Sequence, residues 1–264
     1  MKPMNAGWLF TGKQALDRYL MAVYFTGVAV ATAGLVVGGV RFTTYLLLFS
    51  LYGAAAAPYL VDLGDNCRLS TCFPFVLASG VYLGPGAAAV TAIASSLSFS
   101  LARRNKMAPH KRLFNLCDHV IGGVTAAFVF AWLGGNPAQI MSEGTLRAIL
   151  GATCAFYLVN TGLVSIASAL EQGRSLVQIW IDKFQWTAYS FLAGGSLAII
   201  LILLVKQAGV YTCFLAFPFC VLIYHSWTMQ VSATSFRGPD AAPTSLSDSR
   251  LAGSRRASSL RAQR

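Results

Sequence analysis

The sequence predicts an all-α protein, namely a polytopic bundle of transmembrane helices. Of its 264 residues, 56% are hydrophobic and only 11% are charged, whereas soluble domains usually carry about 25% charged residues. Apolar segments follow one another from about residue 19 to residue 231. The polar stretches between them are far shorter than the roughly 100 residues of a typical soluble domain. The lipid bilayer is therefore the expected environment of nearly the whole chain.

Six segments are long and apolar enough to be full membrane spans, because a helix needs about 20 mostly apolar residues to cross the hydrocarbon core. These segments cover residues 18–39, 43–62, 113–134, 145–170, 186–206 and 210–230. Together with a broken pair of shorter segments, they give about eight hydrophobic segments.

Residues 70–101 form the broken pair. As one helix, these 32 residues would be about 48 Å long, which exceeds the roughly 30 Å of the hydrocarbon core. The stretch contains Gly84, Pro85 and Gly86. Proline removes a helix donor, and glycine loosens the backbone. We therefore expect a helix break here, with two short helices that either cross the membrane or form a re-entrant pair.

Positive charge predicts the orientation of the bundle, because cytoplasmic loops are enriched in Lys and Arg. If the densest basic loop is cytoplasmic, counting the segments places both the N-terminus and the C-terminus in the cytoplasm. If the broken pair crossed only once, the N-terminus would instead lie outside. The basic loop holds Arg103, Arg104, Lys106, Lys111 and Arg112, and the isolated basic residues near the other side are Arg41, Arg147 and Lys206.

Three parts of the chain follow from this count. Residues 1–17 form a cytoplasmic or interfacial N-terminal segment, residues 18–231 the transmembrane domain, and residues 232–264 a basic Ser/Arg-rich tail. The tail has too few apolar residues to fold and is expected to be disordered in the cytoplasm. Residues 175–186 are expected to form a short interfacial helix capped by Ser175, with Trp180 and Trp186 at headgroup level.

The most notable polar residues are Asn115, Asp118 and His119, which follow the basic loop. Spacings of three and four place them on one face of a helix. A carboxylate beside an imidazole can hold a cation or pass a proton. Alternatively, Asp118 lies only about 9 Å inside its span and snorkels to the interface or pairs with Lys111 or Arg112.

A second candidate is Asn160, which lies near the middle of its predicted helix with Tyr157 one turn away. An asparagine at this depth usually hydrogen-bonds to another helix and fixes the packing. Asn160 or Asn115 could equally line a ligand cavity. The sequence leaves both interpretations open.

Other classes of function have little support. The net charge of +11 is concentrated in loops and in the tail, so nucleic acid is not an expected partner. Most of the six cysteines lie in apolar runs, and nothing near Cys67 and Cys72 completes a zinc site. We therefore expect no metal and no cofactor. The chain has no HExxH, Walker or GxSxG motif, and the prediction is that it is not an enzyme.

Several motifs follow one another in a recognisable order. They are FPFVLASGVYLGPGAAAV at 73–90, KRLFN at 111–115, YLVNT at 157–161, EQGRSL at 171–176 and YHSW at 224–227. This series, which covers roughly residues 45–230, resembles the membrane domain that precedes HD-GYP and GGDEF cyclic-nucleotide signalling domains in bacteria. The resemblance implies a sensory or regulatory unit of the bacterial inner membrane. No output domain follows residue 231 here, so the output is expected on a separate polypeptide.

Two hypotheses about function remain. The first is an integral membrane sensory or regulatory protein without a catalytic domain, which relays a membrane or periplasmic cue to a separate cytoplasmic signalling partner. The second is a small-molecule transporter or the substrate-binding membrane subunit of one, because discontinuous helices expose backbone groups to substrates. Small residues at helical spacing also allow a homo-oligomer.

Overall fold

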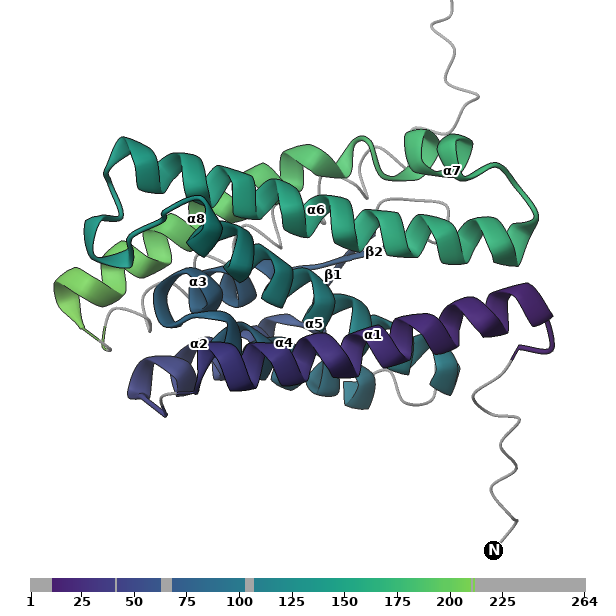
Figure 1. Ribbon diagram of the computed structural model, residues 1–264, viewed down its shortest axis with the longest axis horizontal. Helices are drawn as coiled ribbons and strands as arrows, with labels where there is room; N and C mark the ends of the chain where they lie inside the picture. Colours follow the sequence, from purple (N-terminus) through teal and green to yellow (C-terminus); the bar gives the residue numbers. More distant parts are fainter. Residues whose placement is uncertain (1–10, 41, 63–67, 103–106, 210, 212–264) are drawn as a thin grey trace, which may run out of the picture. The chain divides into compact units, whose positions relative to one another are not determined.

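Apolar helix-forming segments fold into long helices that lie alongside one another (Figure 1). The computed structural model describes residues 11–40, 42–62, 68–102, 107–209 and 211, all of them within one compact unit, residues 1–224. The helices in this part of the chain are α1 (Gln14–Gly38), α2 (Thr44–Ala56), α3 (Phe73–Leu83), α4 (Pro85–Ala102), α5 (Pro109–Trp132), α6 (Glu143–Gln172), α7 (Leu176–Lys183) and α8 (Thr187–Ala208).

Five of the helices in the described residues are long and apolar enough to span a membrane, namely α1, α4, α5, α6 and α8. By this length and composition the chain is an integral membrane protein. The spans predicted over residues 18–39, 113–134, 145–170 and 186–206 coincide with α1, α5, α6 and α8. The predicted span 210–230 and the tail 232–264 lie outside the described residues.

The span predicted over residues 43–62 is wrong, because α2 ends at Ala56 after 13 residues. Such a helix is only about 20 Å long. Pro58 explains the early end, since proline lacks the backbone N–H and clashes with the preceding turn. The chain then forms a short antiparallel hairpin that the sequence did not predict, with Leu60 opposite Ser70; its strands are β1 (Leu60–Asp62) and β2 (Arg68–Ser70).

The predicted helix break is confirmed. Gly84 separates α3 from α4 with a φ of 99°, a conformation that glycine adopts without strain. The two helices run antiparallel, because Ser79 Oγ lies 3.5 Å from the carbonyl oxygen of Ala87. Of these two helices only α3 is short, whereas α4 has 18 residues and is long enough to be a candidate membrane span.

The two ends of the bundle have different contacts. At one end, where α1 and α5 begin and α6 finishes, Lys13 Nζ lies 2.5 Å from the carbonyl oxygen of Glu171, and Lys111 Nζ lies 2.9 Å from Glu171 Oε1. At the opposite end, Lys206 Nζ donates to the carbonyl of Ala138 at 2.7 Å. The structure thus gathers at one end the segments that the charge count assigns to the cytoplasm. The sidedness itself stays a prediction.

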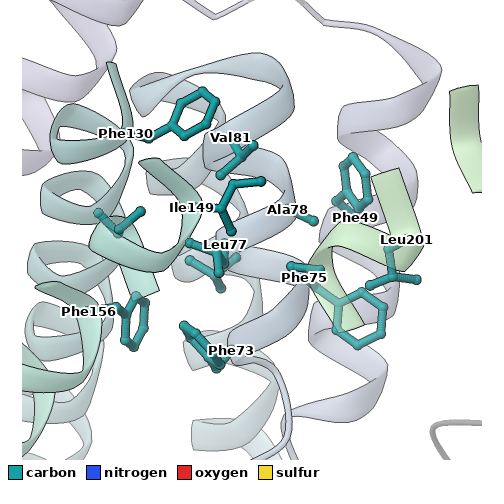
Figure 2. Close-up of a cluster of buried hydrophobic side chains, with 14 of the residues drawn as sticks. Phe49, Phe73, Phe75, Leu77, Ala78, Val81, Phe130, Ile149, Phe156 and Leu201 are labelled. Atoms are coloured by element: carbon teal, nitrogen blue, oxygen red, sulfur yellow. The ribbon is translucent and has the colours of Figure 1, made fainter. Parts of the chain in front are cut away.

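Helix α3 is the centre of the core. All of its residues from Phe73 to Val81 are buried, which is the pattern of a helix covered on every side. Figure 2 shows its side chains among those of α2, α5, α6 and α8. The rings of Phe73 and Phe156 lie 4.6 Å apart, and those of Phe73 and Phe191 lie 4.9 Å apart. The beginning of α3 is therefore held between α6 and α8.

Candidate functional site

A buried carboxylate links α5 to α6. Asp118 on α5 is only 2% exposed, and its Oδ2 accepts a hydrogen bond from the side-chain amide of Asn160 on α6. The other carboxylate oxygen, Oδ1, is buried and has no hydrogen-bond partner in the described part of the chain. A buried acceptor without a donor carries a substantial desolvation cost. In the described part of the chain, Asp118 thus has a hydrogen-bond donor for one of its two carboxylate oxygens and none for the other.

His119 extends this site along α5. Its Nδ1 lies 3.0 Å from the carbonyl oxygen of Asn115, one turn earlier. Because a carbonyl oxygen only accepts, Nδ1 is the donor and carries the proton. The same nitrogen lies 3.9 Å from Asp118 Oδ2. In the neutral imidazole, Nε2 is left with the available lone pair.

Cys72 joins the site from α3. It is the N-cap residue of that helix and is 1% exposed. Its side chain hydrogen-bonds the imidazole of His119. In the sequence, Cys72 is notable only as a cysteine without a zinc-binding set nearby, because nothing local marks a partner that lies on a helix two elements further along the chain.

Asn115 connects the site to the segment before α5. Its side-chain Nδ2 lies 3.8 Å from the Sδ atom of Met107. Met107 also packs against the small cluster formed by Ala57, Cys72 and Phe99. The predicted polar face of Asn115, Asp118 and His119 is therefore present, but each of its three residues has a different partner.

Tyr157 takes no part in the site and lies on another side of α6. Its hydroxyl donates to the carbonyl of Phe184 at 3.1 Å. One turn on, Thr161 donates to the carbonyl of Tyr157 at 2.7 Å and accepts from Trp180 Nε1 of α7 at 3.2 Å. The segment 157–161 thus contacts α5 through Asn160 and the α7–α8 region through its other polar residues.

Two further expectations need correction. Lys111 pairs with Glu171 instead of Asp118, and the low exposure of Asp118 shows that its side chain does not snorkel. Ser175 does occupy the N-cap position of α7, but its side chain makes no cap hydrogen bond. The pairing of Lys111 does not follow from spacing along the chain, because it depends on which side chains of other helices lie within reach.

The helix break lies away from the polar site. Pro85 and Gly86 face the end of α1, where a Cβ on Gly38 would lie 2.9 Å from the backbone nitrogen of Gly86. Pro85 also lies next to Gly34 of α1, as does Val124 of α5, and Val124 is six residues after Asp118, or roughly 9 Å along the helix axis. The structure therefore does not bring Gly84, Pro85 and Gly86 together with the polar residues.

The site can hold a hydrogen-bond donor or a positive charge, because its orphaned atom is a carboxylate oxygen. Within the described ranges, no group of three His, Cys, Asp or Glu side chains is placed to hold a metal ion. The hydroxyls of Ser96 and Ser165 and the Nε atom of Arg112 are also buried without a described partner. A neutral hydroxyl costs less to bury than a carboxylate, and Arg112 as a whole is only partly buried, so Asp118 is the residue that most needs a further partner.

Comparisons of this chain with protein-family models, with curated proteins and with solved structures found no match.

Proposed function

We propose that this chain is a sensory or regulatory protein of the bacterial inner membrane, which receives a cue at Asp118 and passes its state to a separate cytoplasmic partner. The observation that supports this function best is the unpartnered, buried Oδ1 of Asp118. Ionisable residues inside membrane segments are rare and usually serve a function. A small ligand that donates a hydrogen bond or carries a positive charge would satisfy this oxygen.

The contacts of α6 supply a route for the relay. Asn160 holds Asp118 on one side of the helix, and Thr161 holds Trp180 of α7 on the other. A ligand that draws Asp118 away from Asn160 changes the position of this turn of α6. Thr161 is the next residue and is bonded to Trp180, so the movement is transmitted to α7. Hydrogen-bonded elements with two arrangements are the physical basis of such coupling.

Helix α7 is suited to report that movement. Leu176, Val177 and Ile181 are 43%, 62% and 46% exposed, although Ile179 on the same helix is buried. Arg174 and Asp182 pair across the helix at 3.0 Å. A short helix with an apolar exposed face, at the end predicted to be cytoplasmic, can contact the bilayer interface or a partner protein.

Transport is the second candidate function, and the α3–α4 hairpin favours it. The short helix α3 ends at Leu83, just before Gly84, and its first residue, Phe73, lies in the core between α6 and α8. Discontinuous helices of this kind form substrate sites in transporters. Sensing ranks higher because the polar residues lie beside the start of α3 and the break itself lies elsewhere.

Hydrogen–deuterium exchange of the full chain in lipid nanodiscs tests the relay. We expect Asp118→Leu and Asn160→Ala, which both remove the hydrogen bond between these residues, to change the exchange of residues 176–186 several-fold. Arg147→Gln is the matched control, since Arg147 is exposed and pairs with Glu143 at the start of α6. Unchanged exchange in α7 would contradict the relay. Solute uptake by proteoliposomes that depends on Asp118 would replace sensing with transport.

A further inference from the structure

We propose that Cys72, His119 and Met107 form a binding site for a soft monovalent metal ion, of which Cu⁺ is the biological example. The three residues offer a thiol, an imidazole and a thioether from three places in the chain. Thiolate and thioether ligands are the ones that select Cu⁺. This inference goes beyond the proposed function, because the metal ligands lie beside Asp118 and do not include the carboxylate that receives the proposed cue.

The orientation of His119 is that of a metal ligand. Metal-binding histidines almost always donate their second ring N–H to a carbonyl or a carboxylate. Nδ1 of His119 does so, at 3.0 Å from the carbonyl oxygen of Asn115, with Asp118 Oδ2 at 3.9 Å. Nε2 is therefore the nitrogen left to bind a metal ion, and its ring is fixed in place by α5 itself.

Cys72 is the partner of this ring. Because Nδ1 is occupied by Asn115, the hydrogen bond between Cys72 and the imidazole is left to Nε2, with one proton shared between sulfur and nitrogen. A metal ion that replaces this proton binds sulfur on one side and nitrogen on the other. The thiol loses H⁺ to solvent and the sulfur forms a bond to the metal, with no change in oxidation state.

Met107 supplies a third soft donor. Its Sδ lies 3.8 Å from Asn115 Nδ2, on the same residue whose carbonyl holds His119. Met107 packs against the cluster that contains Cys72. Both sulfur atoms thus lie beside one turn of α5, residues 115–119. An apolar environment favours a soft, weakly hydrated ion at such a position.

Charge selects a monovalent ion over a divalent one. One thiolate and one monovalent cation are neutral together, whereas a divalent ion leaves an uncompensated charge in the interior, which is expensive. Asp118 does not compensate that charge as a ligand, because no group of three His, Cys, Asp or Glu side chains in the described residues is placed for a metal. Asp118 instead lies on the Nδ1 side of the His119 ring, with its Oδ2 3.9 Å from that nitrogen.

Competition for Cu⁺ tests the site. The purified full chain is titrated, under reducing and anaerobic conditions in detergent, against the coloured Cu⁺ complex of bicinchoninate. We expect a variant that keeps Cys72 as its only cysteine to remove one equivalent of Cu⁺, and a cysteine-free variant to remove none. His119→Gln in the first variant should bind at least tenfold more weakly, since even outer partners of a metal site are worth about 10–100-fold in affinity.

Met107→Leu should weaken binding less than His119→Gln, and Cys154→Ser in the natural chain should leave it unchanged, because Cys154 is exposed on α6. X-ray absorption of the loaded chain gives a readout that does not depend on any variant folding. We expect sulfur and nitrogen neighbours around copper. Only oxygen and nitrogen neighbours, equal binding by the cysteine-free chain, or equally tight Zn²⁺ binding would each overturn the proposal. Absence of Cu⁺ binding together with an intact α6–α7 relay would reject the metal site and leave the proposed function standing.

Discussion

Asn160 of α6 donates a hydrogen bond to Asp118 of α5, a residue 42 positions earlier in the chain. The bond satisfies one oxygen of a buried carboxylate and leaves the other without a described partner. A purely structural link between two helices would serve better with a neutral side chain, because a buried charge costs several kcal/mol or more when it is poorly paired. The arrangement thus indicates a site that is completed by something else.

Replacing Asp118 separates its structural role from its functional one. In Asp118→Asn the amide oxygen still accepts from Asn160, and the buried charge is gone. We therefore expect thermal unfolding in detergent at an equal or higher temperature, together with loss of the response in α7. Asp118→Leu should instead lower the free energy of unfolding by about 1–3 kcal/mol, because the Asn160 amide loses its acceptor. Equal destabilisation by both variants would show that the charge itself supports the fold.

Close backbone packing at the end of α1 predicts sensitivity at Gly86. A Cβ at this position would meet the carbonyl of Gly39, and neither backbone can move aside easily. We expect Gly86→Ala to destabilise the protein by about 1–3 kcal/mol. The control is Gly162→Ala on α6, where nothing lies within 4 Å of a new Cβ. That change should be neutral or slightly stabilising, since alanine is the better helix former. The comparison is made by thermal unfolding of both variants in the same detergent.

The contact between Trp180 and Thr161 predicts a coupled pair. Trp180→Phe removes the donor and Thr161→Val removes the acceptor of one hydrogen bond. Each should lower local stability by about 0.5–1.5 kcal/mol, visible as faster exchange in residues 176–186. Because both variants remove the same bond, the double variant should resemble either single one. Strictly additive effects would mean that α7 is held by other contacts.

Sidedness is open to a direct measurement. In a cysteine-free background, Lys13→Cys and Lys206→Cys place single thiols at opposite ends of the described bundle. Because positive loops remain in the cytoplasm, we expect a membrane-impermeant maleimide added to intact cells to label position 206 and to leave position 13 unlabelled until the cells are opened. The reverse pattern would invert the predicted topology.

Local features of the fold were predictable from particular residues. Gly84 and Pro85 mark the break between α3 and α4, because one adopts a positive φ and the other cannot donate to a helix. Apolar runs of about 20 residues mark α1, α5, α6 and α8. Pro58 also predicts an early end for α2, but the apolar residues on both sides of it masked that signal.

The candidate site was predictable only in part. Asn115, Asp118 and His119 lie on α5 at helical spacing, so their common face followed from the sequence. The partners of these three residues, however, could not be predicted from the sequence. Asn160, Cys72 and Met107 come from three other segments, and the sequence gives no measure of which helices are neighbours.

The sequence determined that the chain is a helical membrane protein, where its long helices lie, and where one of them breaks, because these properties depend on hydrophobicity and backbone chemistry over a few turns. Tertiary packing decided which apolar helix is buried and which faces the outside. In a membrane protein both kinds of helix are apolar all round, so α3, buried from Phe73 to Val81, looks like any other segment. Packing also decided that one oxygen of Asp118 has no partner among the described residues, since only the positions of the neighbouring helices determine which donors reach it.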